Sequence, residues 1–165
     1  MSLQQELIDQ AEKWIGIKES GGANKGPEVE MFQKAVDNKA QGESWCMAFC
    51  QFCLQQVENN NNIRTNLFQS EHCMTVWNKS PENMRMEVLT PGCIVIWRHG
   101  NSASGHTGIV TSFNADNTFN TIEGNTGAGA GVVADGDGVY RRTRSLQGAG
   151  EMKVVGFLNP FVDQQ

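Results

Sequence analysis

The sequence predicts one α+β domain in which helices come first and an antiparallel sheet follows. Apolar residues recur at helical spacing from the N-terminus to about residue 78. After Pro91-Gly92 the pattern changes to short β-prone segments, which are separated by turns rich in Gly, Asn, Asp and Ser. Such a division along the chain is typical of the α+β class, and 165 residues suit a single compact domain spanning 1–165.

Four helices are expected in the first half of the chain. The first covers residues 2–16 with a serine as its N-cap, and the second begins at Pro27, a residue type that the first helical turn accepts. The third is predicted from Ser44 to about Val57, and a short fourth covers 70–78. The run Asn59–Asn62 is interpreted as a loop because it has no apolar surface to bury.

Five strands are expected in the second half. They cover residues 93–97, 106–113, 118–123, 139–144 and 153–158. The basic segment Arg141–Arg144 is interpreted either as a solvated sheet edge or as a surface that pairs with carboxylates. The Gly-rich loop Thr126–Gly138 is expected to border a substrate groove.

Composition and charge exclude several classes of function. The net charge is −5 with no block of Lys or Arg, so no nucleic acid partner is expected. The longest apolar runs, such as Cys93–Trp97, are far too short to cross a membrane, so no membrane insertion is expected. The N-terminus has no secretory-signal pattern, which predicts synthesis in the cytoplasm and action elsewhere only after release. The five cysteines are expected to be reduced.

One cysteine and one histidine are placed as a nucleophile and a base would be. Cys46 falls at the start of the third helix, where unpaired N–H groups and the helix dipole favour thiolate over thiol. His106 opens one strand, Glu123 closes the next, and Asn125 follows. Adjacent antiparallel strands would bring His106 and Glu123 side by side, which is the Cys-His-polar arrangement of thiol hydrolases. The alternative is that Cys46 is a small buried apolar residue.

A second motif overlaps the first. Cys46, Cys50 and Cys53, with an aromatic residue at position 52, have the spacing by which radical S-adenosylmethionine enzymes hold a [4Fe–4S] cluster. Those cysteines lie on an open loop of a large barrel, whereas here they share one face of a predicted helix in a shorter chain. Cys50 and Cys53 are therefore interpreted as core residues. Asp135–Gly138 is interpreted as a turn rather than a calcium site, and no metal or cofactor is expected.

An ordered set of motifs resembles the CHAP amidase/peptidase family, and its phage-associated branch in particular. The set comprises Trp45–Cys50, Pro91–Trp97, Gly105–Val110 and Ile122–Thr126, with Glu19, Asn24, Gly26 and Gly136–Arg142 as further matches. The resemblance implies a papain-like (NlpC/CHAP) fold, with N-terminal helices packed on an antiparallel β half-barrel. It also implies that Cys46 is the nucleophile, His106 the general base, Glu123 the group that orients the imidazole, and Asn125 an additional polar group.

The resemblance further implies a peptidoglycan hydrolase that cuts an amide or a peptide bond, as a phage endolysin or a delivered effector. We expect a monomer that binds peptidoglycan and, if it is a secreted effector, an immunity protein. A catalytically silent wall-binding domain with the same fold is the alternative. One departure is Trp45, where many relatives have glutamine, which leaves Gln41, Glu43 and Ser44 as candidates for the second oxyanion donor. His72 and His99 are ranked below His106 as bases.

Overall fold

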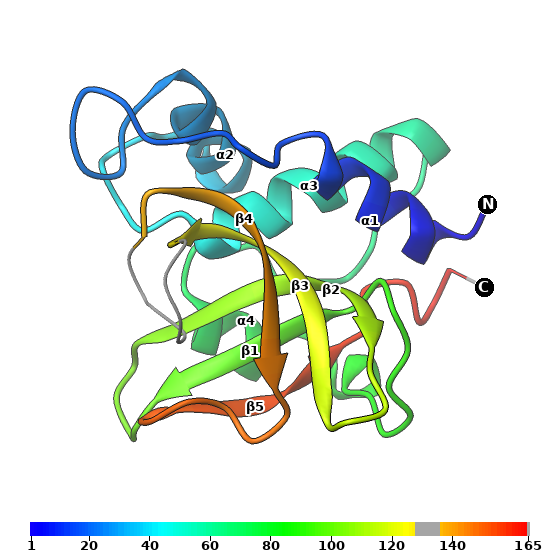
Figure 1. Ribbon diagram of the computed structural model, residues 1–165. Helices are drawn as coiled ribbons and strands as arrows, with labels where there is room; N and C mark the ends of the chain where they lie inside the picture. Colours follow the sequence, from blue (N-terminus) through cyan, green and yellow to red (C-terminus); the bar gives the residue numbers. More distant parts are fainter. Residues whose placement is uncertain (128–135, 165) are drawn as a thin grey trace.

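The computed structural model describes residues 1–127 and 136–164, and its elements follow the expected order (Figure 1). The helices are α1 (Leu3–Glu12), α2 (Pro27–Asp37), α3 (Cys46–Asn61), α4 (Cys73–Lys79) and the 3₁₀ helix η1 (Glu82–Met84). The strands are β1 (Ile94–His99), β2 (Gly105–Phe113), β3 (Thr118–Thr126), β4 (Gly138–Ser145) and β5 (Met152–Leu158). The α+β prediction is confirmed.

The five strands form one antiparallel sheet in the order β4-β3-β2-β1-β5. Helices α1, α2 and α3 lie together over one side of the sheet, above it in the view of Figure 1. Helix α3 packs on the central strands β2 and β3. This is the predicted papain-like plan of N-terminal helices on an antiparallel half-barrel.

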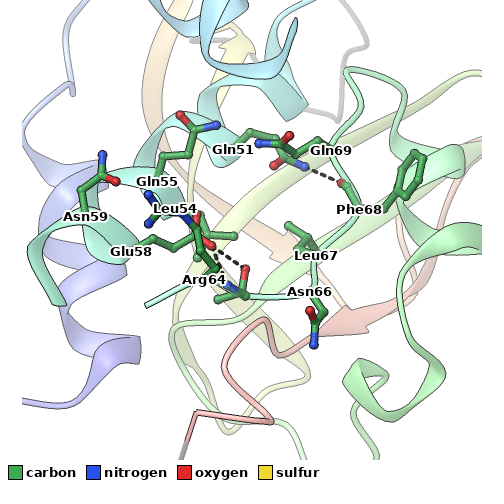
Figure 2. Close-up of a pocket in the computed structure, with 11 residues that line it drawn as sticks. Gln51, Leu54, Gln55, Glu58, Asn59, Arg64, Asn66, Leu67, Phe68 and Gln69 are labelled. Atoms are coloured by element: carbon green, nitrogen blue, oxygen red, sulfur yellow. Dashed lines mark hydrogen bonds between the residues drawn. The ribbon is translucent and has the colours of Figure 1, made fainter. Parts of the chain in front are cut away.

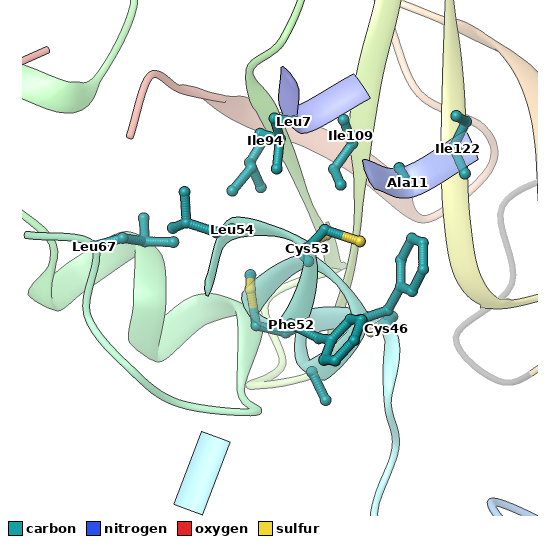
Figure 3. Close-up of a cluster of buried hydrophobic side chains, with 14 of the residues drawn as sticks. Leu7, Ala11, Cys46, Phe52, Cys53, Leu54, Leu67, Ile94, Ile109 and Ile122 are labelled. Atoms are coloured by element: carbon teal, nitrogen blue, oxygen red, sulfur yellow. The ribbon is translucent and has the colours of Figure 1, made fainter. Parts of the chain in front are cut away.

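Alternation along the strands gives the sheet two apolar faces. Ile94 and Ile96 of β1 face the helices, together with Ile109 and Ile122 of the neighbouring strands. Figure 3 shows part of this cluster around α3, including Cys53 and Leu54. The opposite face carries a second cluster, which consists of Cys93, Val95, Trp97, Val110, Phe119, Met152 and Phe157. The sheet is therefore buried on both sides. Polar side chains on its strands, such as His106 and Glu123, are shielded from water.

Several helix boundaries differ from the predictions: α3 begins at Cys46 instead of Ser44, and α4 covers Cys73–Lys79 instead of 70–78. Two more differ for identifiable reasons. Helix α1 ends at Glu12 instead of residue 16, because the chain turns there to pair with β4: Gly16 N donates to Val139 O, and Val139 N donates to Ile17 O. Helix α3 continues to Asn61, so the predicted loop at Asn59–Asn62 is wrong over most of its length. The C-cap that follows it, Asn62, adopts the left-handed conformation that suits this position.

Among the described residues, no helix combines the length and the apolar character needed to span a membrane. The Gly-rich loop that was expected to border the substrate groove falls mostly within residues 128–135, which lie outside the described residues.

Candidate active site

The segment directly before the predicted nucleophile is fixed to three other parts of the fold. Each of its four residues, Gly42–Trp45, is held by a side chain from elsewhere. The bonds are Asn24 Nδ2 to Gly42 O (3.1 Å), Gln33 Nε2 to Glu43 O (2.8 Å), Asn125 Nδ2 to Ser44 Oγ (2.8 Å) and Trp45 Nε1 to Glu19 Oε1 (2.9 Å). Glu19 and Asn24, which belong to the resemblance, therefore anchor the start of α3.

Cys46 is the first residue of α3, and its side chain is buried. Its sulfur lies 3.8 Å from the sulfur of Cys73, the first residue of α4. The hydrogen bond from Cys73 is the main cause that holds the pKa of the Cys46 thiol well below its ordinary value. Burial raises this pKa, whereas His106, by a hydrogen bond and by its charge, and the backbone N–H of Met47 lower it. The site therefore favours the thiolate.

His106 on β2 and Glu123 on β3 are fully buried and directly bonded to each other. Nε2 of His106 and Oε1 of Glu123 are 2.8 Å apart. The side chain of Glu123 passes directly over Gly108. A Cβ at that glycine would lie only 2.6 Å from Cγ of Glu123, so the close approach requires glycine there. The structure thus brings together the two side chains that the sequence placed on neighbouring strands.

The imidazole of His106 is enclosed. The ring of Trp97 stacks on it, with centroids 5.5 Å apart. Within the described residues its second nitrogen, Nδ1, is buried and has no hydrogen bond of standard geometry. Burial lowers the pKa of His106, but Cys46 and Glu123 outweigh burial and raise it to about 9. The surroundings thus favour an imidazolium beside a thiolate.

Glu123 is bound on its other side by Arg144 of β4, which the sequence interpretation placed either on a solvated edge or on a surface that pairs with carboxylates. Nε and Nη2 of Arg144 donate to the two carboxylate oxygens over 2.8 and 2.6 Å, and Thr121 Oγ1 donates to Oε2. Burial raises the pKa of Glu123, but the bonds from Arg144 and His106 lower it to about 2. The edge interpretation suits exposed Arg141 and is wrong for Arg144, which is buried.

The side chain of Asn125 forms its hydrogen bonds with residues other than His106. This residue sits within β3, which continues to Thr126 beyond the predicted end at 123, and its φ of 54° interrupts the regular pairing with β4. Its Nδ2 donates to Ser44, and its Oδ1 accepts from Gly136 N over 3.2 Å. Asn125 therefore ties the segment before Cys46 to the sheet.

The remaining histidines have other surroundings. His99 is the last residue of β1 rather than part of the following loop, and its exposed ring pairs with Glu151 at 3.2 Å. His72 is the N-cap of α4 rather than a residue within a helix, and its side chain is 73% exposed. Neither ring has the enclosure that His106 has.

The other cysteines of the cluster motif belong to the core. Cys50 and Cys53 are fully buried on α3, and the sulfur of Cys50 lies 3.9 Å from Thr107 Oγ1. Burial is the main cause that raises the pKa of each thiol. In the described parts of the chain, no three His, Cys, Asp or Glu side chains are grouped as metal ligands. The iron–sulfur alternative therefore finds no support in the arrangement of these side chains.

A hollow of about 310 Å³ opens over the nucleophile. It is lined by Ser44, Cys46, Glu71, His72, Cys73, Ala103, Ser104 and Gly105. Of the three candidates for the second oxyanion donor, Ser44 is the one that lines this hollow, whereas Gln41 N bonds to the Glu43 side chain.

A larger hollow of about 690 Å³ lies along α3 and residues 64–69 (Figure 2). Its polar groups bond to one another: Gln51 donates to Phe68 O, and Glu58 accepts from Thr65. These bonds hold residues 64–69 against α3, and none of the predicted catalytic residues lines this hollow.

A family model described as the CHAP domain matches residues 38–125, which is more than half of the chain. The chain belongs to the CHAP family. CHAP membership indicates a peptidoglycan hydrolase type of function in general, with peptidoglycan as substrate. A comparison with curated proteins gave no match. The matched range includes Cys46, His106, Glu123 and Asn125.

Two residues at the CHAP site were missed by the sequence analysis. Cys73 comes from a helix start 27 residues after Cys46, and nothing in its local pattern indicates a partner for a thiolate. Arg144 lies on the same face of β4 as Arg142, and its pairing opposite buried Phe119 places it in the interior. Strand alternation puts Arg144 and Thr143 on opposite faces, but it does not say which of the two faces is buried.

Proposed function

We propose that this CHAP domain is a cysteine hydrolase that cuts an amide or peptide bond of peptidoglycan. In this proposal Cys46 is the nucleophile, His106 is the acid and base, and Glu123 orients the imidazole. One observation carries it: a fully buried His106–Glu123 bond of 2.8 Å beside a helix-start thiol that interacts electrostatically with the same imidazole. An enclosed thiolate–imidazolium pair is the arrangement that activates cysteine for acyl transfer.

The steps follow from the atoms available. Because Nε2 is held by Glu123, Nδ1 is the ring nitrogen left to take the thiol proton. The Cys46 thiolate attacks the substrate carbonyl, and His106 returns the proton to the leaving amine as the C–N bond breaks. Water, deprotonated by His106, then hydrolyses the thioester and frees Cys46.

The oxyanion of the tetrahedral intermediate needs two donors. The backbone N–H of Cys46, at the open end of α3, is the first. Ser44 is favoured as the source of the second because it lines the hollow and is held by Asn125. Asn125 would then support the oxyanion site through Ser44, rather than assisting the imidazole.

The whole chain, residues 1–165, is proposed to form this one catalytic domain, which acts as a monomer on the wall or in the periplasm, where peptidoglycan lies. An endolysin released during phage lysis and a delivered effector, with its immunity protein, both suit such an enzyme. The competing hypothesis is a CHAP domain that binds wall material without cutting it. It predicts binding to sacculi with no released fragments.

The deciding experiment is mass spectrometry of fragments released from purified sacculi. New N-terminal alanine on free stem peptides identifies an N-acetylmuramoyl-L-alanine amidase, whereas cleaved crosslinks identify an endopeptidase. Cys46→Ala should release nothing. Cys50→Ala, four residues along the same helix, should keep the activity and lose about 1 kcal/mol or more of stability. Wild-type fragment release by Cys46→Ala would refute the mechanism.

A further inference from the structure

Arg144 completes a line of four buried groups that runs across four elements of the fold. Cys46 lies on α3, His106 on β2, Glu123 on β3 and Arg144 on β4. Each of these side chains is at most 4% exposed. With the thiolate and the imidazolium formed, the charges alternate in sign along the line and sum to zero. Removing any one of them would leave a net charge where water cannot screen it.

The contacts of Arg144 are directed at Glu123. Nε binds Oε2 at 2.8 Å and Nη2 binds Oε1 at 2.6 Å, which is the two-pronged geometry that fixes a carboxylate plane. Nη2 also lies 3.3 Å from Thr126 Oγ1, and the guanidinium lies 5.8 Å from the centre of the Trp97 ring. Trp97 in turn stacks on His106. Arg144 therefore touches both groups that hold the imidazole in place.

We propose that Arg144 is a positioning residue for catalysis: it keeps Glu123 ionised and aligned with His106 Nε2, so that Cys46 and His106 can carry opposite charges in a buried site. This inference rests on the proposed Cys46–His106 mechanism. A carboxylate at this depth without a cation would leave the line one negative charge in excess, and the site would relieve it by protonating Cys46. Arg144 prevents that outcome.

Within residues 1–127 and 136–164, two buried thiols lie beside this line, and the side chains of Glu71 and His72 share with Cys46 the hollow that opens to solvent. Cys50 of α3 and Cys73 of α4 are both buried, and the pKa of each is raised, Cys50 chiefly by burial and Cys73 chiefly by its bond to Cys46. Both are therefore neutral over the range where an enzyme is assayed. The charge of Arg144 has no other buried charge in this set to compensate for its loss.

The test is the pH dependence of Cys46 alkylation by iodoacetamide, read by mass spectrometry on the full chain without substrate. In Arg144→Met, the pH at which the alkylation rate rises (the acid limb of the profile) should increase by about one pH unit or more. The reason is that loss of a nearby cation raises a thiol pKa. Arg144→Lys, which keeps the charge and loses the fork, should move the acid limb less. Arg144→Met combined with Glu123→Gln removes one charge of each sign and should return the limb close to its wild-type position. Arg141→Met, an exposed arginine on the same strand, is the matched control and should leave it unchanged.

The outcomes separate this inference from the proposed function. An unmoved limb in Arg144→Met, with circular dichroism showing the native fold, overturns the role of Arg144. If the acid limb of the double variant stays at the same raised pH as that of Arg144→Met, the claim that Arg144 acts on Cys46 through Glu123 is wrong. If Arg144→Met does not fold, Arg144→Lys and the charge-balanced double variant still decide the matter. A failure of the proposed hydrolase mechanism is seen elsewhere, as fragment release by Cys46→Ala.

Discussion

The sulfur of Cys73 lies 3.8 Å from the sulfur of Cys46, and the two cysteines begin two different helices. Because the pKa of Cys73 is raised, chiefly by this same contact, Cys73 remains a thiol and can donate to a Cys46 thiolate. Hydrogen bonds to charged groups contribute about 1.5–3 kcal/mol, which corresponds to about one pH unit or more. Cys73→Ala should therefore shift the alkylation profile of Cys46 to higher pH.

Two variants sharpen this prediction. Cys73→Ser restores a donor and should return the profile toward that of the wild type. Cys53→Ala removes a core thiol of α3 and should lower stability without moving the profile. A Cys73→Ala profile that coincides with the wild type would show that the contact has no influence on the nucleophile.

The pH–rate profile should have a basic limb set by His106. The thiolate–imidazolium pair exists above the lowered pKa of Cys46 and below the pKa of His106, about 9. kcat/KM on a soluble muropeptide should thus fall as the pH rises through about 9, because His106 no longer carries the proton for the leaving amine. His106→Ala should lose about 10²–10⁴-fold in rate. His99→Ala should behave like wild type, and the reverse result for these two variants would move the site to the end of β1.

Glu123 and Asn125 should differ in which feature of the profile they control. Glu123→Gln removes a charge bonded to the imidazole, so it should displace the profile along the pH axis as well as lower it. Asn125→Ala removes the bond to Ser44 and should lower the height alone. Asn120→Ala is the control on the same strand, since its side chain bonds to Ser112 and Thr143 away from the site. Displacement by Asn125→Ala and none by Glu123→Gln would exchange their roles.

The buried carboxylate should also make the fold sensitive to acid. The pKa of Glu123 is about 2 in the fold, where bonds from Arg144 and His106 outweigh burial, against an ordinary value of 4.5. Its contribution to stability is therefore fully present above pH 4.5 and is lost as the pH falls toward 2. The difference corresponds to about 3 kcal/mol.

Urea unfolding at several pH values between 3 and 7 measures this contribution. Glu123→Gln should be less stable at neutral pH, because Arg144 loses its partner, and should show a flatter dependence below 4.5. Exposed Glu151→Gln should keep the wild-type slope. Equal slopes in wild type and Glu123→Gln would rule out Glu123 as the source.

The elements of this fold are predictable because their signals are local. The helical stripe around Cys46 and the strand that opens near His106 need only neighbouring residues, and the resemblance supplied the four predicted site residues. Arg144 and Cys73 could not be found this way. The burial of Arg144 depends on its pairing opposite Phe119, and the position of Cys73 depends on how α4 packs on β1 and β2. Both are long-range relationships to which a single sequence gives little access.

The close contact between Gly108 and Glu123 constrains which residues other family members can carry at this strand position. The Glu123 side chain occupies the volume where a β-carbon at position 108 would stand. A family member that carries any bulkier residue at the equivalent strand position, and a glutamate on the next strand, must send its carboxylate along another path. The residue at that single position in other members would therefore help to distinguish catalytically active CHAP domains from inactive ones that retain the fold.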